Sequence, residues 1–374
     1  MNLSRQGDAH PRSVTLRTSS EQVWVIKEAW QRLAATSPHK NVFRTFEWCW
    51  AWWIHIGSRD SAHSLYVLTV EVLGQITAIA PLMLRTAERN GLSQRRLEFL
   101  GGGGWSDYHD ILLGEDSQED LGAIFYFLAR ESKNWDLIRL EQVQQHSELE
   151  RTLQDAVRVA GLHCRRFETE RCYFLPIECD FREWLKHRSA SSRKTFQTKI
   201  NRLRRLERAG LKISVIENPQ DFSDLAMRMA ALEEQKTERG FTPVIGRSVR
   251  FFEAVFETLG PGRWIYVITA EHEDRLVAYQ LGFRCGENLW DYAKAYDSAH
   301  SYFSLGTLMI SRLLQYGFEG GFRQYDFLRG DEAYKRRWTE MFRNNVTFII
   351  SSSRLRSSLL ARYHAQRQGA GGSL

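Results

Sequence analysis

The sequence predicts an α+β protein with two similar halves, each built on a mixed sheet flanked by helices. Its 374 residues suffice for two domains of ordinary size, and 43% of them are hydrophobic, which is enough to bury two cores. Antiparallel hairpins followed by a strand, a helix and a further strand occur twice along the chain. We therefore expect a first domain at residues 1–175, a second at residues 176–355, and a basic, flexible tail at residues 356–374.

The hairpin is the clearest signal in the first half. The β-rich runs SLYVLTVEVLG (64–74) and QITAIAPLMLR (75–85) meet at a glycine, as the strands of a hairpin do. The other elements expected in this half are, in order, strand 14–18, helices 21–35 and 46–56, strand 97–100, helix 118–132, strand 135–140, helix 147–160 and strand 163–169.

The second half opens with a long helix, which we expect over residues 181–209 and which Gly210 would end. Its hairpin is formed by RWIYVITAEH (263–272) and RLVAYQLGFRC (275–285). The remaining elements are expected as strand 211–217, helices 219–238 and 247–259, strand 287–297, helix 304–318, strand 324–328, a short helix at 332–338 and strand 345–350.

Composition excludes several classes of protein. Aromatic residues make up 12% of the chain, which argues against disorder, and no apolar run reaches the ~18–20 residues of a membrane span. The first residues lack the apolar core of a signal peptide, and the five cysteines form no CxxC pair. The eleven histidines show neither HxH nor HExxH spacing. We expect a cytoplasmic protein without a bound metal.

Positive charge is concentrated in one segment. The net charge is +6, but residues 186–212 hold ten lysines and arginines and one glutamate, so the rest of the chain is slightly acidic. Phe196, Ile200, Leu203 and Leu206 form an apolar stripe along this helix. The helix could simply be solvated and packed by its stripe, or it could bind an anionic ligand, a membrane surface or RNA. No zinc finger or RNA-binding signature accompanies it, so sequence-specific DNA binding is not expected.

The loop before helix 304–318 has the form of an anion site. A strand delivers the chain to Ser304, Leu305, Gly306 and Thr307, where an apolar helix begins. The free N–H groups and the dipole of such a helix start favour phosphate oxygens, and a glycine lets the backbone come close to a ligand. The alternative is an ordinary helix capped by serine or threonine.

The segment DFLRGDEAYKRRW (326–338) is a second candidate site. It follows a strand and gathers polar and charged side chains around a glycine turn: Asp326, Arg329, Asp331, Tyr334 and Lys335. Loops at strand ends are where proteins with a rigid sheet present reactive groups. A salt-bridged surface turn is the alternative, above all for Arg336 and Arg337.

A third polar cluster follows four glycines in GGGGWSDYHD (101–110). The glycines match neither a Walker motif nor a dinucleotide fingerprint, so a flexible turn is the simpler interpretation of them. Asp107, Tyr108, His109 and Asp110 stand ahead of an apolar run, where they could contact a substrate.

These segments together resemble a known family. The chain is similar, over about residues 40–340, to the GNAT-superfamily proteins of the CelD-like group named for cellulose or exopolysaccharide biosynthesis, which are related to the FemABX peptidyltransferases. The similarity rests on VFRTFEWCWAWWIHIG, SDYHDILL, RSASSRKTFQTKINRLRRLERAG, AYD with SLGTL, and most specifically YDFLRGDEAYKRRW. Where a GNAT enzyme carries Gln/Arg-x-x-Gly-x-Gly/Ala, this chain reads SYFSLGT and keeps one glycine.

The resemblance implies two tandem GNAT-like domains and an acyltransferase. Its donor would be acetyl-CoA or another acyl-CoA, and its acceptor an amine or hydroxyl of a sugar or cell-envelope precursor. Aminoacyl transfer from tRNA, as in FemABX enzymes, and a non-catalytic accessory role in polysaccharide synthesis are the alternatives. The strands at 287–297 and 324–328 would spread apart, with the reactive end of the donor in the gap.

The resemblance also assigns roles to residues. Tyr334 would protonate the leaving thiolate, Lys335 would stabilise developing charge, and Asp326 and Asp107 are the carboxylates that could act as base or bind the acceptor. The donor would be held by Ser304, Leu305, Gly306, Thr307 and Arg329. The residues expected to contact the acceptor or an anionic surface are Tyr108, Asp110, Arg193, Lys194, Lys294 and Tyr296.

Overall fold

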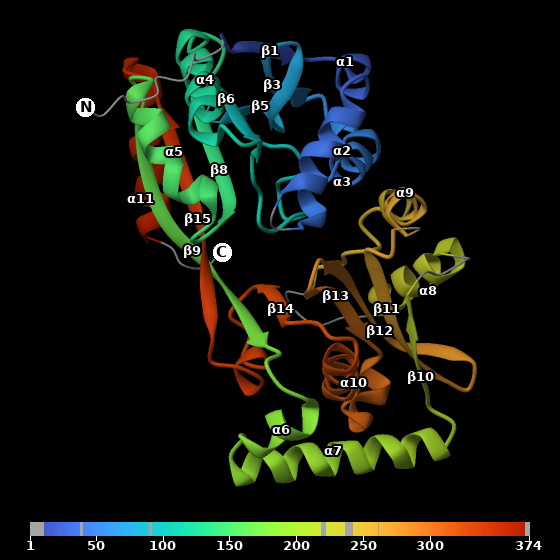
Figure 1. Cartoon of the computed structure of the whole chain (residues 1–374). Coiled ribbons are helices and arrows are strands. Elements are labelled where there is room, and N and C mark those ends of the chain that lie inside the picture. The colour runs from blue at the N-terminus through green and yellow to red at the C-terminus, as the bar shows by residue number, and fades with distance from the viewer. Residues whose placement is uncertain are drawn as a thin grey trace. The chain divides into compact units, whose positions relative to one another are not determined.

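The computed structural model describes residues 11–37, 40–89, 92–217, 222–235, 242–260 and 262–370, and the chain forms two compact units (Figure 1). The first unit consists of residues 1–170 and 343–374, and the second unit of residues 171–342. The chain passes from the first unit to the second along β9 (His163–Pro176) and returns along β15 (Phe342–Ser351). The expected boundary is a single one at residue 175, whereas the chain crosses between the units twice.

The first unit contains two sheets. Its strands besides β9 and β15 are β1 (Ser13–Arg17), β2 (His63–Leu65), β3 (Val67–Val72), β4 (Gln75–Ala80), β5 (Leu82–Arg89), β6 (Leu92–Phe99), β7 (Leu112–Leu113) and β8 (Leu137–Gln144). One sheet is antiparallel with the order β1-β3-β4-β7. The other runs β15-β8-β6-β5-β2, with β6 and β8 parallel and the remaining pairs antiparallel. Pro81 separates β4 from β5, because proline has no N–H to donate to a ladder.

Helices cover these sheets. They are α1 (Ser20–Trp24), α2 (Lys27–Thr36), α3 (Phe46–His55), α4 (Ser117–Arg130), α5 (Glu148–Val159) and α11 (Leu355–Ala370), with one-turn helices η1 (Val42–Arg44) and η2 (Gly57–Arg59). The helix expected at residues 21–35 is thus two helices. The apolar faces of α4 and α5 join the buried core of the sheets through residues such as Phe125 and Leu153.

The second unit is built on a mixed sheet with the order β10-β11-β12-β13-β14-β9. Its own strands are β10 (Lys212–Ile216), β11 (Ile265–His272), β12 (Arg275–Cys285), β13 (Asn288–Tyr296) and β14 (Gln324–Arg329). Its helices are α6 (Phe181–Lys186), α7 (Ala190–Arg208), α8 (Phe222–Glu234), α9 (Val249–Leu259), η3 (Ser298–Phe303), α10 (Leu305–Glu319) and η4 (Lys335–Arg337). β13 and β14 are parallel, and the other pairs are antiparallel.

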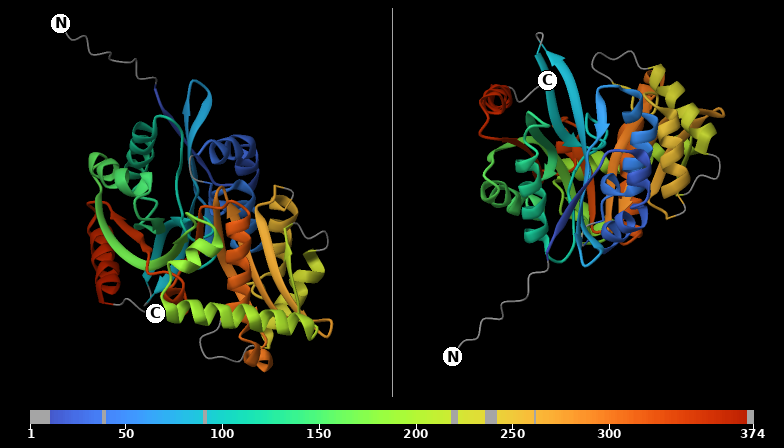
Figure 2. Two further views of the ribbon diagram at one scale, coloured as in Figure 1. Left: turned by 60° about the horizontal axis from the view of Figure 1, so that its bottom comes forward. Right: turned by 90° about the horizontal axis from the view of Figure 1, so that it is seen from above.

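Helices α8 and α10 cover opposite faces of this sheet (Figure 2). Ile268 on β11 belongs to the core that α10 joins, whereas Tyr279 on β12 contacts Glu233 of α8. Ile268 pairs with Gln280, so Tyr279 points to the other side of the sheet. The α10 face is the one on which the candidate site lies.

The two units each contain a hairpin with the same type of turn. The hairpins β3–β4 and β11–β12 both turn through two residues with positive φ, Leu73 and Gly74 in one and Glu273 and Asp274 in the other. Positive φ at both central residues is typical of the turn whose twist matches that of the strands. Each hairpin also carries a register shift close to its turn, between Val70 and Glu71 or between Ala270 and Glu271. Both predicted hairpins are confirmed, and so is the mixed α+β fold.

The long helix expected at residues 181–209 is wrong. Two helices, α6 and α7, replace it, and the chain turns between them at residues 187–189. In one continuous helix, residues twelve apart would lie about 18 Å from each other. The rings of Trp184 and Phe196 instead meet edge to face with centroids 5.3 Å apart. Packing of these two aromatic rings therefore outweighs the helical propensity of the intervening residues.

The expected flexible tail is also wrong in its first part. Residues 355–370 form α11, in which Ala361, His364 and Ala365 are buried. The small residues let the helix lie close to β8 and β15, whose Leu137 and Ile349 share a cluster with Ala361. Two further predictions changed in extent: the short helix at 332–338 is the single turn η4, and the strand at 163–169 continues to Pro176. The ends of the helix expected at 219–238 lie outside the described residues.

Candidate active site in the second unit

The strands β13 and β14 separate in the middle of the sheet. They pair in parallel at Leu289 with Tyr325 and at Trp290 with Asp326, and no later pair joins them within the described residues. On its other side β14 pairs with β9 along its length, and the register shifts between Asp326 and Arg329, where Arg329 lies opposite Cys172. The second halves of β13 and β14 are thus not paired with each other among the described residues, as the resemblance predicts, and we call the place between them the opening.

A β-bulge arranges the side chains of β13 along this opening. Leu281 pairs with Ala293 and Gly282 with Asp291, which leaves Tyr292 as the extra residue. In a regular strand, residues three apart point to opposite faces. The bulge brings Asp291 and Lys294 to the same face, where the Lys294 ammonium forms an ion pair with Oδ2 of the buried Asp291.

Tyr334 lies next to this ion pair. It stands at the start of η4, and Lys294 Nζ lies 4.5 Å from the centroid of its ring. Phe327 of β14 packs edge to face against the same ring, with centroids 6.3 Å apart. Burial raises the pKa of the Tyr334 hydroxyl well above its ordinary value, and the negative charge of Asp291 acts in the same direction. The hydroxyl therefore stays protonated at neutral pH.

Buried polar groups on the neighbouring strands complete the site. Gln280 on β12 donates a hydrogen bond of 2.8 Å from Nε2 to the hydroxyl of Tyr325 on β14. Tyr266 on β11 donates one of 2.9 Å to the carbonyl of Trp290. Burial, followed by the charge of Asp291, raises the pKa of both tyrosines well above the usual range. The residues predicted from the sequence do not include Gln280, Tyr325 and Asp291. An aspartate within a strand, next to a partner strand that contains a glycine, is the signal that could have found Asp291.

Lys335 does not belong to this group of side chains around the opening. It is 2% exposed, and its ammonium donates to the carbonyls of Leu328, Arg329 and Gly330 at 2.5 to 3.3 Å. Glu332 lies 2.9 Å away as its ion-pair partner. The ammonium therefore binds four acceptors and stabilises the turn after β14. Because Tyr334 follows this turn, Lys335 also determines the position of Tyr334.

Asp326 stabilises the same turn. Its side chain is fully buried, and Oδ1 accepts a hydrogen bond of 2.8 Å from the N–H of Leu328. Leu328 has a φ of +54°, a conformation that costs free energy for a residue with a bulky side chain. Asp326 and Lys335 therefore stabilise a strained backbone at the end of β14, where Arg329 is the last residue of the strand.

The start of α10 meets the end of β13. A Cβ on Gly306 would lie 3.9 Å from Cδ1 and Cε1 of Tyr296, so the Tyr296 ring stands beside the first turn of the helix. Ser304 precedes the helix with a φ of +56° and makes no capping hydrogen bond with its side chain. Its carbonyl accepts from the N–H groups of Thr307 and Leu308 at 3.1 and 3.2 Å. The structure thus brings Ser304–Thr307 and Tyr296 together.

The basic helix α7 packs by its predicted stripe. Phe196 is buried and meets Trp338 edge to face at 4.9 Å, and Leu206 packs on the same core. Arg193 donates to the carbonyls of Lys186 and Arg188 at 2.9 and 3.1 Å, which caps α6. The cations exposed on α7 are Arg193, Lys194, Arg204, Arg205 and Arg208. In the left view of Figure 2, α7 is the long light-green helix.

The predicted residues Asp107, Tyr108 and Asp110 belong to the first unit. Asp107 and Tyr108 are buried, and the carbonyl of Tyr108 accepts a hydrogen bond of 2.6 Å from Nδ2 of Asn41. Asp110 pairs with the buried Arg44 at 2.9 Å. Burial raises the pKa of Asp110 to about 6, although Arg44 acts against the shift.

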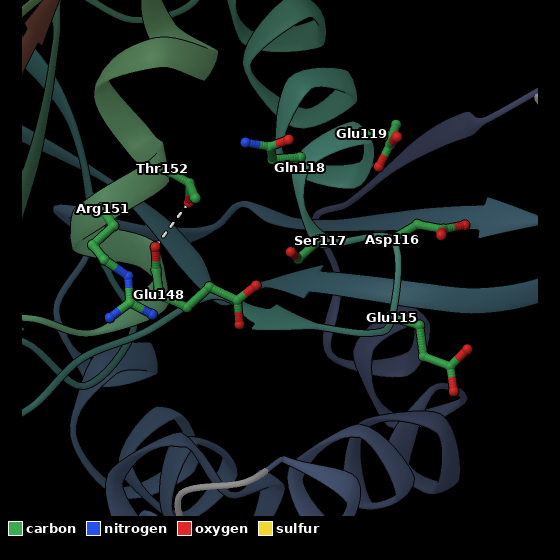
Figure 3. A pocket seen from close by; sticks show the side chains of 8 residues that line it. All are labelled: Glu115, Asp116, Ser117, Gln118, Glu119, Glu148, Arg151 and Thr152. Atoms are coloured by element: carbon green, nitrogen blue, oxygen red, sulfur yellow. Dashed lines mark hydrogen bonds between the residues drawn. The ribbon is translucent and has the colours of Figure 1, made fainter. Parts of the chain in front are cut away.

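A shallow acidic hollow of about 380 Å³ also lies in the first unit (Figure 3). It is formed by the starts of α4 and α5, and Glu115, Glu119 and Glu148 contribute carboxylates to it. Asp116 at its edge pairs with Arg12 at 3.1 Å. None of the predicted site residues lines the hollow. The described part of the chain contains neither a metal-binding group of acidic, histidine and cysteine side chains nor a helix able to span a membrane.

Comparison with known proteins agrees with the fold of the second unit. Residues 190–336 match the model of the Acetyltransf_6 family, described as an acetyltransferase (GNAT) domain. The solved structure of FemX is 10% identical with a TM-score of 0.60, and the match covers 86% of this chain and 95% of that one. The structure of L-PGS from Bacillus licheniformis is 14% identical with a TM-score of 0.52, covering 92% and 97%. No curated protein matches the chain.

The matched segment carries α7 to η4, and therefore both strands of the opening, the start of α10 and Tyr334. This segment is similar to a GNAT acetyltransferase domain, and the class of enzyme that the similarity supports is an acyltransferase.

Proposed function

We propose that the second unit transfers an acyl group from acyl-CoA, with acetyl-CoA as the first donor to test, to an amine or hydroxyl of a sugar or cell-envelope precursor. One observation carries the proposal: a half-buried, protonated Tyr334 faces Lys294 beside the opening between β13 and β14. The start of α10 stands next to the end of β13 at Tyr296. A donor with its phosphates on the N–H groups of α10 would therefore reach the opening with its thioester.

The chemistry needs one proton donor at the leaving sulfur. The acceptor attacks the thioester carbonyl carbon, the carbon–sulfur bond breaks, and the thiolate takes the proton of the Tyr334 hydroxyl. The proton of the acceptor passes to solvent or to a base. The ammonium of Lys294 above the ring stabilises the phenolate that forms when Tyr334 loses its proton. Asp291 holds that ammonium in place.

The predicted roles of the other residues change under this proposal. We assign Lys335 and Asp326 to positioning, because their charged groups bind the backbone of the turn that carries Tyr334. Lys294 and Tyr296 become residues of the donor site. Arg193 and Lys194 remain candidates for contact with an anionic acceptor, since both are exposed on α7. We keep the prediction that the acceptor contacts Asp107, Tyr108 and Asp110.

Tyr334→Phe tests the proposal. Hydroxylamine replaces the unknown acceptor, and the release of free thiol from acetyl-CoA reports the reaction. We expect a loss of ~100-fold or more in turnover with donor affinity nearly unchanged, because phenylalanine keeps the packing and removes only the proton. Tyr126→Phe is the matched control, since Tyr126 is 61% exposed on α4 in the first unit. Equal rates in both variants and the wild type would end the assignment of Tyr334.

The exposed cations of α7 favour one second candidate, aminoacyl transfer from aminoacyl-tRNA. A helix that presents Lys194, Arg204 and Arg208 to solvent could follow a phosphate backbone. Thermal unfolding with acetyl-CoA, longer acyl-CoAs, free CoA and charged tRNA separates the candidates, because a ligand that binds the native state raises the melting temperature. Stabilisation by charged tRNA with a steep dependence on salt would favour the tRNA donor. Stabilisation by none of them would favour an accessory role without catalysis.

A further inference from the structure

A groove of about 660 Å³ lies in the first unit, away from every residue to which a role has been given above. It is bordered by the end of α5, the start of β9, the end of β15 and the first half of α11, which lie side by side in Figure 1. Its volume is in the range of sites that hold small molecules of nucleotide size. Elements far apart in the sequence thus meet at one concave surface.

Positive charge dominates the lining. Arg158 of α5, Arg165 of β9 and Arg362 of α11 border the groove, and Asp155 contributes the single carboxylate of that lining. Asp155 pairs with Arg158 at 3.3 Å. For Arg165 and Arg362, both exposed, the described residues provide neither an ion pair nor a hydrogen bond. Two guanidinium groups from different elements are therefore available at one groove.

The floor of the groove offers hydroxyl groups. Ser351 ends β15 and is 4% exposed, so the little surface it presents belongs to the bottom of the groove. Ser358 of α11 lies beside it and donates to the carbonyl of Ser352 at 3.3 Å, which leaves its oxygen free to accept. Hydroxyls below a pair of guanidinium groups suit a ligand with both acceptor and donor oxygens.

Backbone carbonyls that would repel an anion are already occupied. The last turn of α5 is closed by Gly161, which has a φ of +75° and donates to the carbonyl of Arg158 at 3.0 Å. Leu162 donates to the carbonyl of Val157 at 3.1 Å. These two bonds complete the usual glycine-based end of a helix. The partial negative charge at this helix end is thereby reduced where it faces the groove.

We propose that this groove binds a small molecule that carries a diphosphate, held by Arg165 and Arg362. Planar guanidinium groups bind phosphate oxygens with two parallel hydrogen bonds each, and Arg158 can exchange its exposed pairing with Asp155 for the same contact. The site is independent of the proposed acyl-donor site, which belongs to the second unit.

Inorganic pyrophosphate and uridine diphosphate are the probes. We compare the wild type with Arg165→Ala/Arg362→Ala and with the control Arg59→Ala/Arg130→Ala, which removes two exposed arginines elsewhere in the first unit. Isothermal titration should show affinity lower by about tenfold or more for each guanidinium removed in the groove variant, and no change in the control. Hydrogen exchange should show protection by pyrophosphate in peptides that cover residues 162–165 and 351–362.

The melting temperature without ligand serves as an independent readout, and it should be the same in all three proteins. Equal affinity of the groove variant and the control for pyrophosphate would overturn the proposal. So would the absence of binding or of protection at these peptides up to millimolar probe. None of these results depends on whether the second unit transfers acyl groups.

Discussion

Replacement of Gly282 by alanine should destabilise the second unit strongly. Gly282 lies at the bulge between β12 and β13, opposite Asp291. A Cβ at this position would lie 2.1 Å from the hydroxyl oxygen of Tyr266 and 2.3 Å from the carbonyl oxygen of Trp290. Both distances are more than 1 Å shorter than ordinary contact, which is about 3.5 Å between heavy atoms. One of the two obstacles is backbone, so a change of side-chain rotamer does not relieve it.

The free-energy cost has two sources. Overpacking of a core by one carbon costs about 1–3 kcal/mol. The strands can separate only by breaking the hydrogen bond from Tyr266 to Trp290, and a buried polar group left without its partner costs about 1–3 kcal/mol more. We expect a total of about 2–6 kcal/mol, which corresponds to a fall of roughly 4–24 °C in the melting temperature of a unit of this size.

Calorimetry of the variant measures this effect. Gly306→Ala is the control for stability, because a Cβ there meets Tyr296 only at the ordinary contact distance of 3.9 Å. We expect its melting temperature to be unchanged or slightly raised, since alanine favours a helix more than glycine does. A Gly282→Ala protein with the stability of the wild type would refute the bulge as described, and with it the alignment of Asp291 and Lys294 on one face.

Two further predictions concern buried charges. Lys335→Met should lower the melting temperature, because the ammonium binds the turn after β14, and it should leave the acetyl-CoA affinity of the folded protein unchanged. A variant with normal stability that no longer releases thiol from acetyl-CoA would contradict this role. The second concerns Asp110, whose pKa of about 6 lies above the ordinary value of 3.8, so that the folded protein takes up this proton more readily than the unfolded chain does. The contribution of this carboxyl to stability is therefore present at pH 4 and is lost as the pH rises through 6. Asp110→Asn should remove this pH dependence from the free energy of unfolding. If the free energy of unfolding of the variant differs from that of the wild type by a constant amount from pH 4 to 7, the prediction is wrong.

The sequence predicts those parts of the fold that depend on local patterns. Each hairpin is visible as two apolar runs around a turn, and the helices α4, α5, α9 and α10 follow from periodicity, with a capping serine only at α5 and α9. These signals involve residues close together in the chain, which is why they can be interpreted without the structure. The break between α6 and α7 depends on the contact between Trp184 and Phe196 and has no such signal.

The candidate site was predictable in part. Tyr334, Lys294 and the start of α10 were candidates from the resemblance and the loop pattern, whereas Asp291 was not a candidate. Aspartate and lysine three residues apart in a strand are expected on opposite faces, and only the bulge brings them together. The role of Lys335 depends on a backbone turn with positive φ at Leu328, which residue types alone do not reveal.

Binding of acetyl-CoA to the wild type and to Gly306→Ala tests the central claim most directly, because the claim is that the donor lies against the start of α10 beside the opening between β13 and β14. An added methyl group at residue 306 has open space apart from Tyr296, so the fold tolerates it, but it would stand where the phosphates approach the backbone. Isothermal titration should show affinity lower by roughly tenfold or more, about 1.4 kcal/mol, with no loss of melting temperature. Equal affinity of the two proteins for acetyl-CoA, or no binding by the wild type, would contradict the account.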